Sequence, residues 1–196
     1  MVAILALLVG CAPTPASIEF SAAEVAISSK DGAAEPTSTV KAADGAAIEG
    51  VAAKCTAPEG VTLADGKVTV AKSGTYTVDC AVEGTEVKAS YTVKAAIPGK
   101  FTAALESVAM GATADVTIGW MDDADQALAA APAGAAVAVS LVDATKSTIA
   151  TVDGTKVTGV AEGEVELMAK AEGFPEVKFM VKVVKADAAA AAPAAQ

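Results

Sequence analysis

Acidic residues gather at one point of the sequence, where they could hold a cation. Asp122, Asp123 and Asp125 lie almost side by side, and Ca²⁺ binds clustered carboxylate oxygens in loops. The spacing of the EF-hand loop, with its central Gly and distal Glu, is missing here. The three aspartates are therefore a candidate calcium site, and a solvated acidic loop is the alternative.

A second string has the spacing of a nucleophile and its base. Ser38-Thr39-Val40-Lys41 matches Ser-x-x-Lys, in which the Ser opens a helix and the Lys reaches back to it. Here the string lies in a predicted strand, where residues three apart point to opposite faces. The chain also has no His, the commonest general base and metal ligand. We therefore predict that the protein is not an enzyme and binds no cofactor.

Composition limits both the partners and the core. The net charge of -10 opposes binding to nucleic acid, because the phosphate backbone repels an acidic surface. The chain has four Phe, two Tyr and one Trp, so we expect thin cores built mostly from Val, Ile and Leu. The Trp, Trp120, shares a face with Val116 and Ile118 in an alternating segment and is predicted to lie in a core.

The N-terminus carries an apolar run that ends in a cysteine. The run from Val2 to Val9 is shorter than the about 20 residues that span a bilayer and has the size of a signal-peptide core. Leu8-Val9-Gly10-Cys11 resembles a bacterial lipobox, although no Lys or Arg precedes the run. The resemblance implies acylation of Cys11 and, because Ala12 follows, an outer-membrane address. The alternative is a hydrophobic leader with an incidental Cys.

Two long segments of the chain repeat each other. Asp65-Gly66 and Asp153-Gly154, 88 positions apart, each open the same order of short strand, Gly turn, long alternating strand, Gly turn and last strand. Period-two alternation between Gly and Asp turns is typical of antiparallel strands covered on one side. We predict an all-β chain with a signal peptide (1–10), a lipid-anchored tether (11–17), two domains (18–96 and 97–186) and a disordered Ala-rich tail (187–196).

One part of the repeat resembles a known family. Asp65-Gly66, Lys67-Val68-Thr69-Val70 and Ser73-Gly74-Thr75-Tyr76-Thr77-Val78 resemble a bacterial Ig-like domain of the group 2 type. The resemblance extends over both repeats and implies tandem Ig-like antiparallel β-sandwich domains. It says little about function, because such modules accompany adhesins, glycan-active enzymes and phage tail proteins alike.

The remaining cysteines are predicted to pair. Cys55 and Cys80 share the inward face of their strands, and an exported protein meets an oxidising compartment. We expect a disulfide with Cα atoms about 5.5–6 Å apart, the alternative being two unpaired buried thiols. In the second repeat Ala169 takes the place of Cys80, and the position of Cys55 falls at Val139 or Ser140.

These predictions combine into one function. We expect a non-enzymatic outer-membrane lipoprotein, periplasmic or surface-exposed, whose two Ig-like modules form a rod for adhesion, spacing or docking. Its partners are the membrane, through the lipid on Cys11, and a protein or a glycan, with no nucleic acid. The alternatives are an accessory Ig-like subunit of a larger envelope or phage-type assembly, or a glycan-binding module, which would need exposed aromatic residues.

Overall fold

The computed structural model describes residues 13–186, and these form two compact units. Unit 1 ends at Ala96 and unit 2 begins at Ile97, and each is described by itself. The predicted signal peptide, Cys11 and the predicted tail (187–196) lie outside the described residues. Within residues 13–186, no helix has the length and apolar character needed to cross a membrane.

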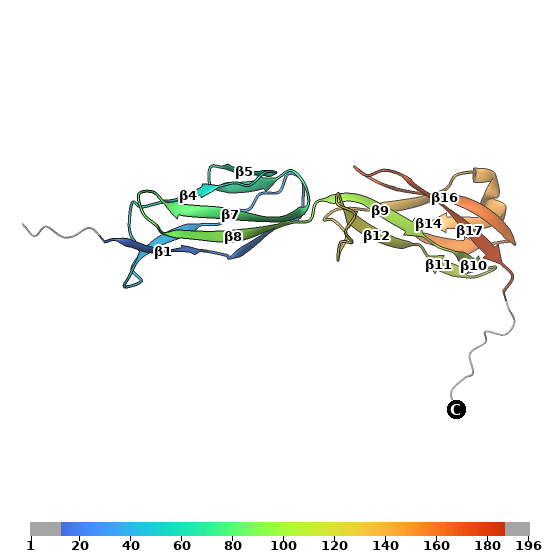
Figure 1. The fold of residues 1–196 in the computed structure, drawn as a ribbon. Helices are drawn as coiled ribbons and strands as arrows, with labels where there is room; N and C mark the ends of the chain where they lie inside the picture. Colours follow the sequence, from blue (N-terminus) through green and yellow to red (C-terminus); the bar gives the residue numbers. More distant parts are fainter. Residues whose placement is uncertain (1–12, 187–196) are drawn as a thin grey trace, which may run out of the picture. The chain divides into compact units, whose positions relative to one another are not determined.

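Unit 1 is an all-β, Ig-like sandwich (Figure 1). One layer is the four-stranded sheet β2-β8-β7-β4, and the unit also contains the two-stranded sheets β1-β3 and β5-β6. Phe20 of β1 contacts Tyr91 of β8 across the layers. The strands of the described residues 13–96 are β1 (Pro15–Phe20), β2 (Glu24–Ile27), β3 (Ser38–Ala42), β4 (Ala53–Thr56), β5 (Val61–Ala64), β6 (Lys67–Val70), β7 (Gly74–Val82) and β8 (Lys88–Ala95).

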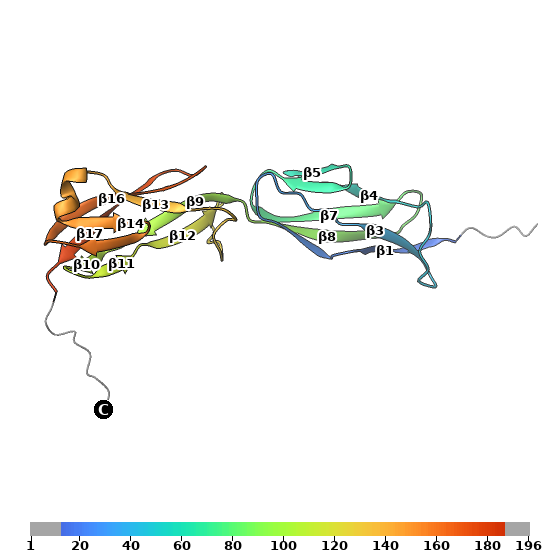
Figure 2. The same ribbon diagram turned by 180° about the vertical axis from the view of Figure 1, so that it is seen from behind.

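Unit 2 repeats this plan (Figure 2). Its four-stranded sheet is β10-β17-β16-β13, and the other layer contains β11-β15-β14 and β12-β9. Its elements within residues 97–186 are β9 (Pro98–Ala104), β10 (Ser107–Ala109), β11 (Thr113–Asp115), β12 (Thr117–Asp122), β13 (Val137–Leu141), the 3₁₀ helix η1 (Ala144–Thr148), β14 (Ala150–Asp153), β15 (Lys156–Gly159), β16 (Gly163–Ala171) and β17 (Val177–Val184).

Alternating side chains build both cores. Along β7, Val78 and Cys80 are buried whereas Thr77 and Asp79 are exposed, so one face of the strand meets the opposite layer. Val is the commonest buried residue in both units, as the composition predicts. Unit 2 adds an aromatic group that includes Trp120, which is only 7% exposed. The prediction that this Trp lies in a core is confirmed.

The structure corrects two expectations about the strands. β2 runs parallel to β8, and β10 runs parallel to β17, although the alternation predicts antiparallel strands. Alternation within one strand cannot reveal the direction of a neighbour that is distant in the sequence. The predicted tether over residues 11–17 is also too long, because β1 begins at Pro15 and pairs with β3.

When the two units are aligned by their strands, the offset between the repeats is one residue larger than the Asp-Gly dipeptides indicate. The β5–β6 loop is Asp65-Gly66, with φ of 51° and 77°, whereas the β14–β15 loop is Gly154-Thr155, with φ of 61° at Gly154. Asp65 therefore corresponds to Gly154, because each two-residue loop needs a left-handed residue at its first position. With this match, the buried Val68 and Val157 occupy the same place in the two units.

Candidate functional site

The structure contains the predicted disulfide. Cys55 on β4 and Cys80 on β7 are bonded and lie directly opposite each other in the ladder. Their Cα atoms are 4.0 Å apart, so the predicted bond is confirmed and the predicted separation of 5.5–6 Å is wrong. Facing residues of adjacent antiparallel strands are already close, and this register brings the two Cα atoms nearer than a typical disulfide requires. In unit 2, Val139 lies opposite Ala169 in the matching positions.

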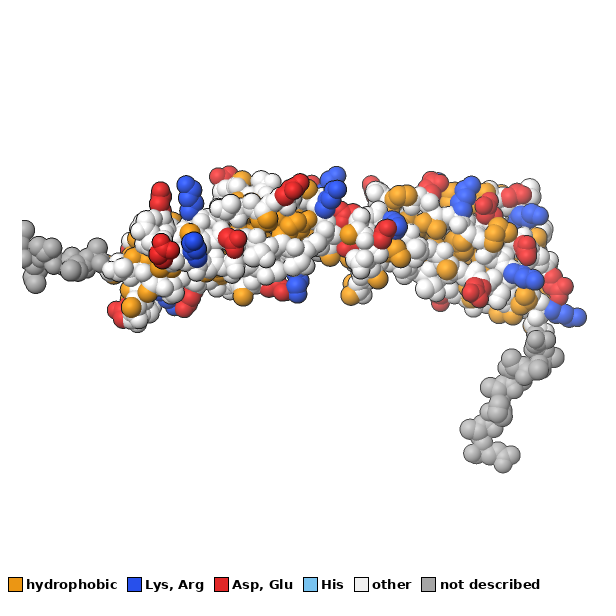
Figure 3. Space-filling view, in the orientation of Figure 1, with side chains coloured by type: hydrophobic (Ala, Val, Ile, Leu, Met, Phe, Trp, Pro, Cys, Tyr) orange, Lys and Arg blue, Asp and Glu red, His pale blue; other side chains and the backbone are white. Residues whose placement is uncertain are grey.

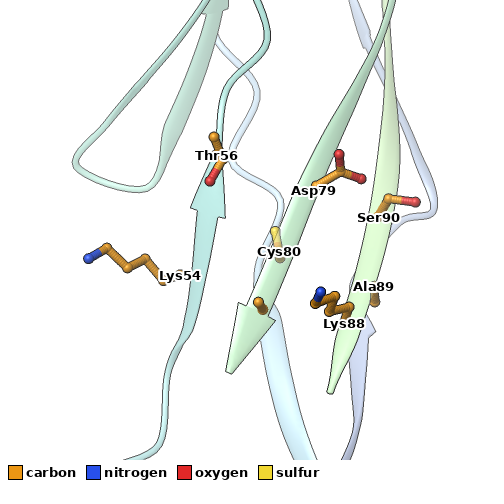
Figure 4. Close-up of a pocket in the computed structure, with 8 residues that line it drawn as sticks. Lys54, Thr56, Asp79, Cys80, Lys88, Ala89 and Ser90 are labelled. Carbon is orange, nitrogen blue, oxygen red and sulfur yellow. The ribbon is translucent and has the colours of Figure 1, made fainter. Parts of the chain in front are cut away.

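A shallow hollow of about 530 Å³ lies on the sheet next to this bond (Figure 4). Lys54 and Lys88 flank Ala81 in one row across β4, β7 and β8, and Asp79 lies in the next row. Two ammonium groups and one carboxylate offer ion pairing and hydrogen bonds. The sulfur of Cys80 is held in the disulfide, so it cannot serve as a thiolate nucleophile.

A smaller cavity of about 260 Å³ lies inside unit 1. The apolar part of its wall includes Phe20, Leu63 and Val68, and Cys55 also borders it. Polar groups reach the same space from three separate segments of the chain. They belong to Ser38, Asp65, Gly66, Lys67 and Tyr91. No sequence pattern identified this cavity.

The candidate calcium site is not formed. Asp122 is 6% exposed, and its Oδ1 accepts hydrogen bonds from the backbone N–H groups of Ala124 and Gln126, at 2.9 and 2.8 Å. The carboxylate of Asp125 instead pairs with Lys100. Within residues 13–186, no group of three or more His, Cys, Asp or Glu side chains is arranged to hold a metal. Asp122 shapes the turn after β12, and the three carboxylates do not converge.

The Ser-x-x-Lys string is not a catalytic pair either. Ser38 and Lys41 both lie on β3, where residues three apart face opposite sides. The ammonium group of Lys41 forms an ion pair with Glu19 at 2.6 Å. Lys41 therefore supports the pairing of β3 with β1, and its nitrogen is not available to take a proton from Ser38.

Two titrating groups have shifted pKa values. Hydrogen bonds from the hydroxyl and the backbone N–H of Thr145, at 2.7 and 2.9 Å, lower the pKa of Asp143, which caps η1. Burial raises the pKa of Tyr91. The first shift belongs to a helix cap, which an Asp before a short helix can signal in the sequence. The second concerns a phenol that borders the smaller cavity.

Charged side chains are interspersed on the face of each unit that Figure 3 shows. Acidic and basic groups lie near each other there. The described residues also form exposed ion pairs, such as Lys94 with Glu24 and Lys170 with Glu176. This face therefore has no continuous basic stripe of the kind that follows a nucleic-acid backbone.

Similar proteins are found among solved structures. No family model matches the chain, and no curated protein matches it. Among solved structures, the S-layer protein rSbsC is 23% identical with a TM-score of 0.48, over 87% of this chain and 28% of that one. Domains 4 and 5 of SbsC are 22% identical with a TM-score of 0.48, over 85% and 96%. The Escherichia coli adhesin FdeC is 19% identical with a TM-score of 0.42, over 86% and 63%. These likenesses assign no function to this chain.

Proposed function

We propose that the protein is an exported, lipid-anchored module of a bacterial envelope, whose Ig-like units dock a partner and catalyse no reaction. The disulfide between Cys55 and Cys80 carries this proposal. Such bonds persist in oxidising compartments and are rare in the cytosol. The bond also makes sense in a unit of this size, whose core contains few large side chains.

The anchor in this proposal is a lipid on Cys11. Each buried CH₂ group of an acyl chain contributes about 0.8 kcal/mol, and more than one chain gives stable attachment. β1 begins at Pro15, and four peptide steps reach at most about 14 Å. Unit 1 would therefore stay close to the membrane surface. Ala12 supports an outer-membrane address through the lipobox resemblance.

Binding is proposed because the three candidate reactive groups named above have structural partners. Cys80 is in the disulfide, Lys41 pairs with Glu19, and Asp122 caps a turn. The hollow and the cavity of unit 1 instead offer hydrogen-bonding groups beside apolar walls. Such sites suit a protein or a glycan as partner, whereas the net charge of -10 disfavours nucleic acid.

Metabolic labelling with palmitate in an expressing bacterium tests the anchor. The wild-type chain should incorporate label and sediment with membranes, and Cys11→Ser should do neither. The double variant Cys55→Val, Cys80→Ala is the matched control, since it keeps Cys11 and should be labelled normally. A wild-type chain without label, or a Cys11→Ser chain that stays on the membrane, would contradict the proposal.

Counting free thiols tests the acylation of Cys11 independently of the labelling experiment. The sequence has three Cys, of which two are in the disulfide. Acylation of Cys11 would leave no titratable thiol in the denatured, unreduced protein. One titratable thiol per chain would show that Cys11 is unmodified, and three would show that the disulfide does not form in the cell.

A further inference from the structure

The smaller cavity of unit 1 exists because a strand ladder stops early. Ala34 exchanges two backbone hydrogen bonds with Val68, at 3.0 and 2.7 Å. Two residues further on, Pro36 has no N–H to donate, so the ladder toward Gly66 ends there. The chain therefore separates from β6 where the cavity begins.

In unit 2, the backbone hydrogen bonds at the corresponding position continue beyond the Ala114–Val157 pair. Ala114 lies opposite Val157, as Ala34 lies opposite Val68. Two residues further on, the N–H of Val116 donates to the Thr155 carbonyl oxygen at 2.9 Å, and Val116 is buried. Val116 corresponds to Pro36. This position is thus a Val where the ladder continues in unit 2 and a Pro at the cavity of unit 1.

The wall of this opening includes a largely buried phenol. Tyr91 is only 4% exposed and borders the cavity. No fully enclosed side-chain oxygen among the described residues lacks a partner. A bound group that exchanges hydrogen bonds with this phenol could take the place of water at the cavity wall.

We propose that this cavity binds one uncharged sugar ring, as the end residue of a glycan. Its volume of about 260 Å³ is below the about 300–1,000 Å³ of pockets for drug-sized ligands, which fits a single ring. A pyranose has an apolar C–H face and hydroxyls that both donate and accept. The half-buried Phe20, with Leu63 and Val68, provides apolar wall in place of the exposed aromatic residues expected of a glycan-binding module, and Tyr91 provides a polar group.

Charges at the cavity favour a neutral ligand. Asp65 and Lys67 both line it, and Lys67 pairs with Glu35 at 3.0 Å. Groups of both signs can hydrogen-bond to sugar hydroxyls, whereas a charged ligand would meet a like charge. The Gly66 carbonyl and the Ser38 hydroxyl add further hydrogen-bonding groups. This inference deepens the docking role proposed above by naming the partner's chemistry, and it does not depend on the lipid.

NMR titration of the full chain tests the site. The probes are glucose, galactose, mannose, fucose, N-acetylglucosamine and N-acetylgalactosamine, with phenol and glucose 6-phosphate for comparison. At least one neutral sugar should give saturable amide shifts around Ser38, Gly66 and Tyr91. Tyr91→Phe should weaken binding about fivefold, the effect of losing one neutral hydrogen bond. Pro36→Val, which copies unit 2, should weaken it at least tenfold.

Tyr76→Phe is the matched control. It removes the other tyrosine hydroxyl of the chain, which donates to the Lys72 carbonyl oxygen, and should bind as wild type. Ser38→Ala provides a second, exposed change if Tyr91→Phe unfolds. The proposal is overturned if no neutral sugar saturates, if Tyr91→Phe and Pro36→Val bind as tightly as wild type, or if phenol or glucose 6-phosphate binds more tightly than every neutral sugar. None of these results would alter the palmitate outcome, so the two proposals fail separately.

Discussion

Opening the Cys55–Cys80 bond should destabilise unit 1 and leave unit 2 unchanged. The bond joins residues with a sequence separation of 25, and the chain-entropy model gives about 3.5 kcal/mol for a closed loop of that length. In a domain of this size, 1 kcal/mol shifts Tm by about 4–8 °C. Reduction should therefore lower the Tm of unit 1 by about 14–28 °C.

Unit 2 provides the matched reference for this experiment. Its Val139 and Ala169 face each other where unit 1 has the two cysteines. The double variant Cys55→Val, Cys80→Ala copies that pair, so it should unfold as the reduced wild type does. Adding reductant to the variant should then change nothing, because no disulfide remains in either unit.

Calorimetry of the full chain, with and without reductant, records the two transitions. The single Trp of the chain, Trp120, lies in unit 2, so tryptophan fluorescence identifies the transition of that unit. The reasoning is refuted if reductant moves the fluorescence midpoint by as much as the other transition. It is equally refuted if neither transition moves, since the loop would then contribute nothing to stability.

Three further outcomes are expected. Gly159→Ala places a Cβ atom 2.7 Å from the Ala109 carbonyl oxygen, so it should destabilise unit 2 by about 1–3 kcal/mol, measured as a lower midpoint of tryptophan fluorescence. Asp122→Ala removes the acceptor of two backbone N–H groups and should cost roughly 1–3 kcal/mol in the same assay, whereas Asp125→Asn, which loses an exposed ion pair, should cost at most about 1 kcal/mol. Burial raises the pKa of Tyr91 above 10.0, so the neutral phenol contributes fully to the stability of unit 1 below pH 10.0, and this contribution declines as the pH rises through the folded pKa. The urea midpoint of unit 1 should therefore fall above pH 10.0. A midpoint that does not fall, or that falls equally in Tyr91→Phe, would contradict this.

Strands and the disulfide were predictable because their signals are local. Alternation along β7 places Val78 and Cys80 on one face, and an inward Cys in a chain predicted to be exported is expected to pair. The same reasoning identified Trp120 as a core residue. In each case the side chain's direction follows from its neighbours in sequence, which the strand period fixes.

Features that depend on strand pairing were not predictable in this way. The Asp-Gly dipeptides of the two repeats fill different positions of their loops, so matching Asp65 with Asp153 misaligns the repeats by one residue. Which strand lies beside β2 or β10 is decided by contacts distant in the sequence.

The candidate sites show the same limit. Asp122 has the chemistry of a calcium ligand, but its carboxylate is used by the backbone that follows it. Pro36 did carry a signal, since a Pro has no N–H to continue a strand ladder. Only the pairing with β6, and the contrast with Val116, shows that a cavity results.

The parallel pairing of β2 with β8 and of β10 with β17 has a mechanical consequence. In each unit one of these strands lies early and the other is last, so tension on the two ends slides them lengthwise past each other. Their hydrogen bonds, along four residue pairs in unit 1 and three in unit 2, are then loaded together in shear. A hairpin pulled open at its ends would instead break its bonds one after another. Each of these strand pairs can therefore bear a pulling force before the core of its unit is exposed.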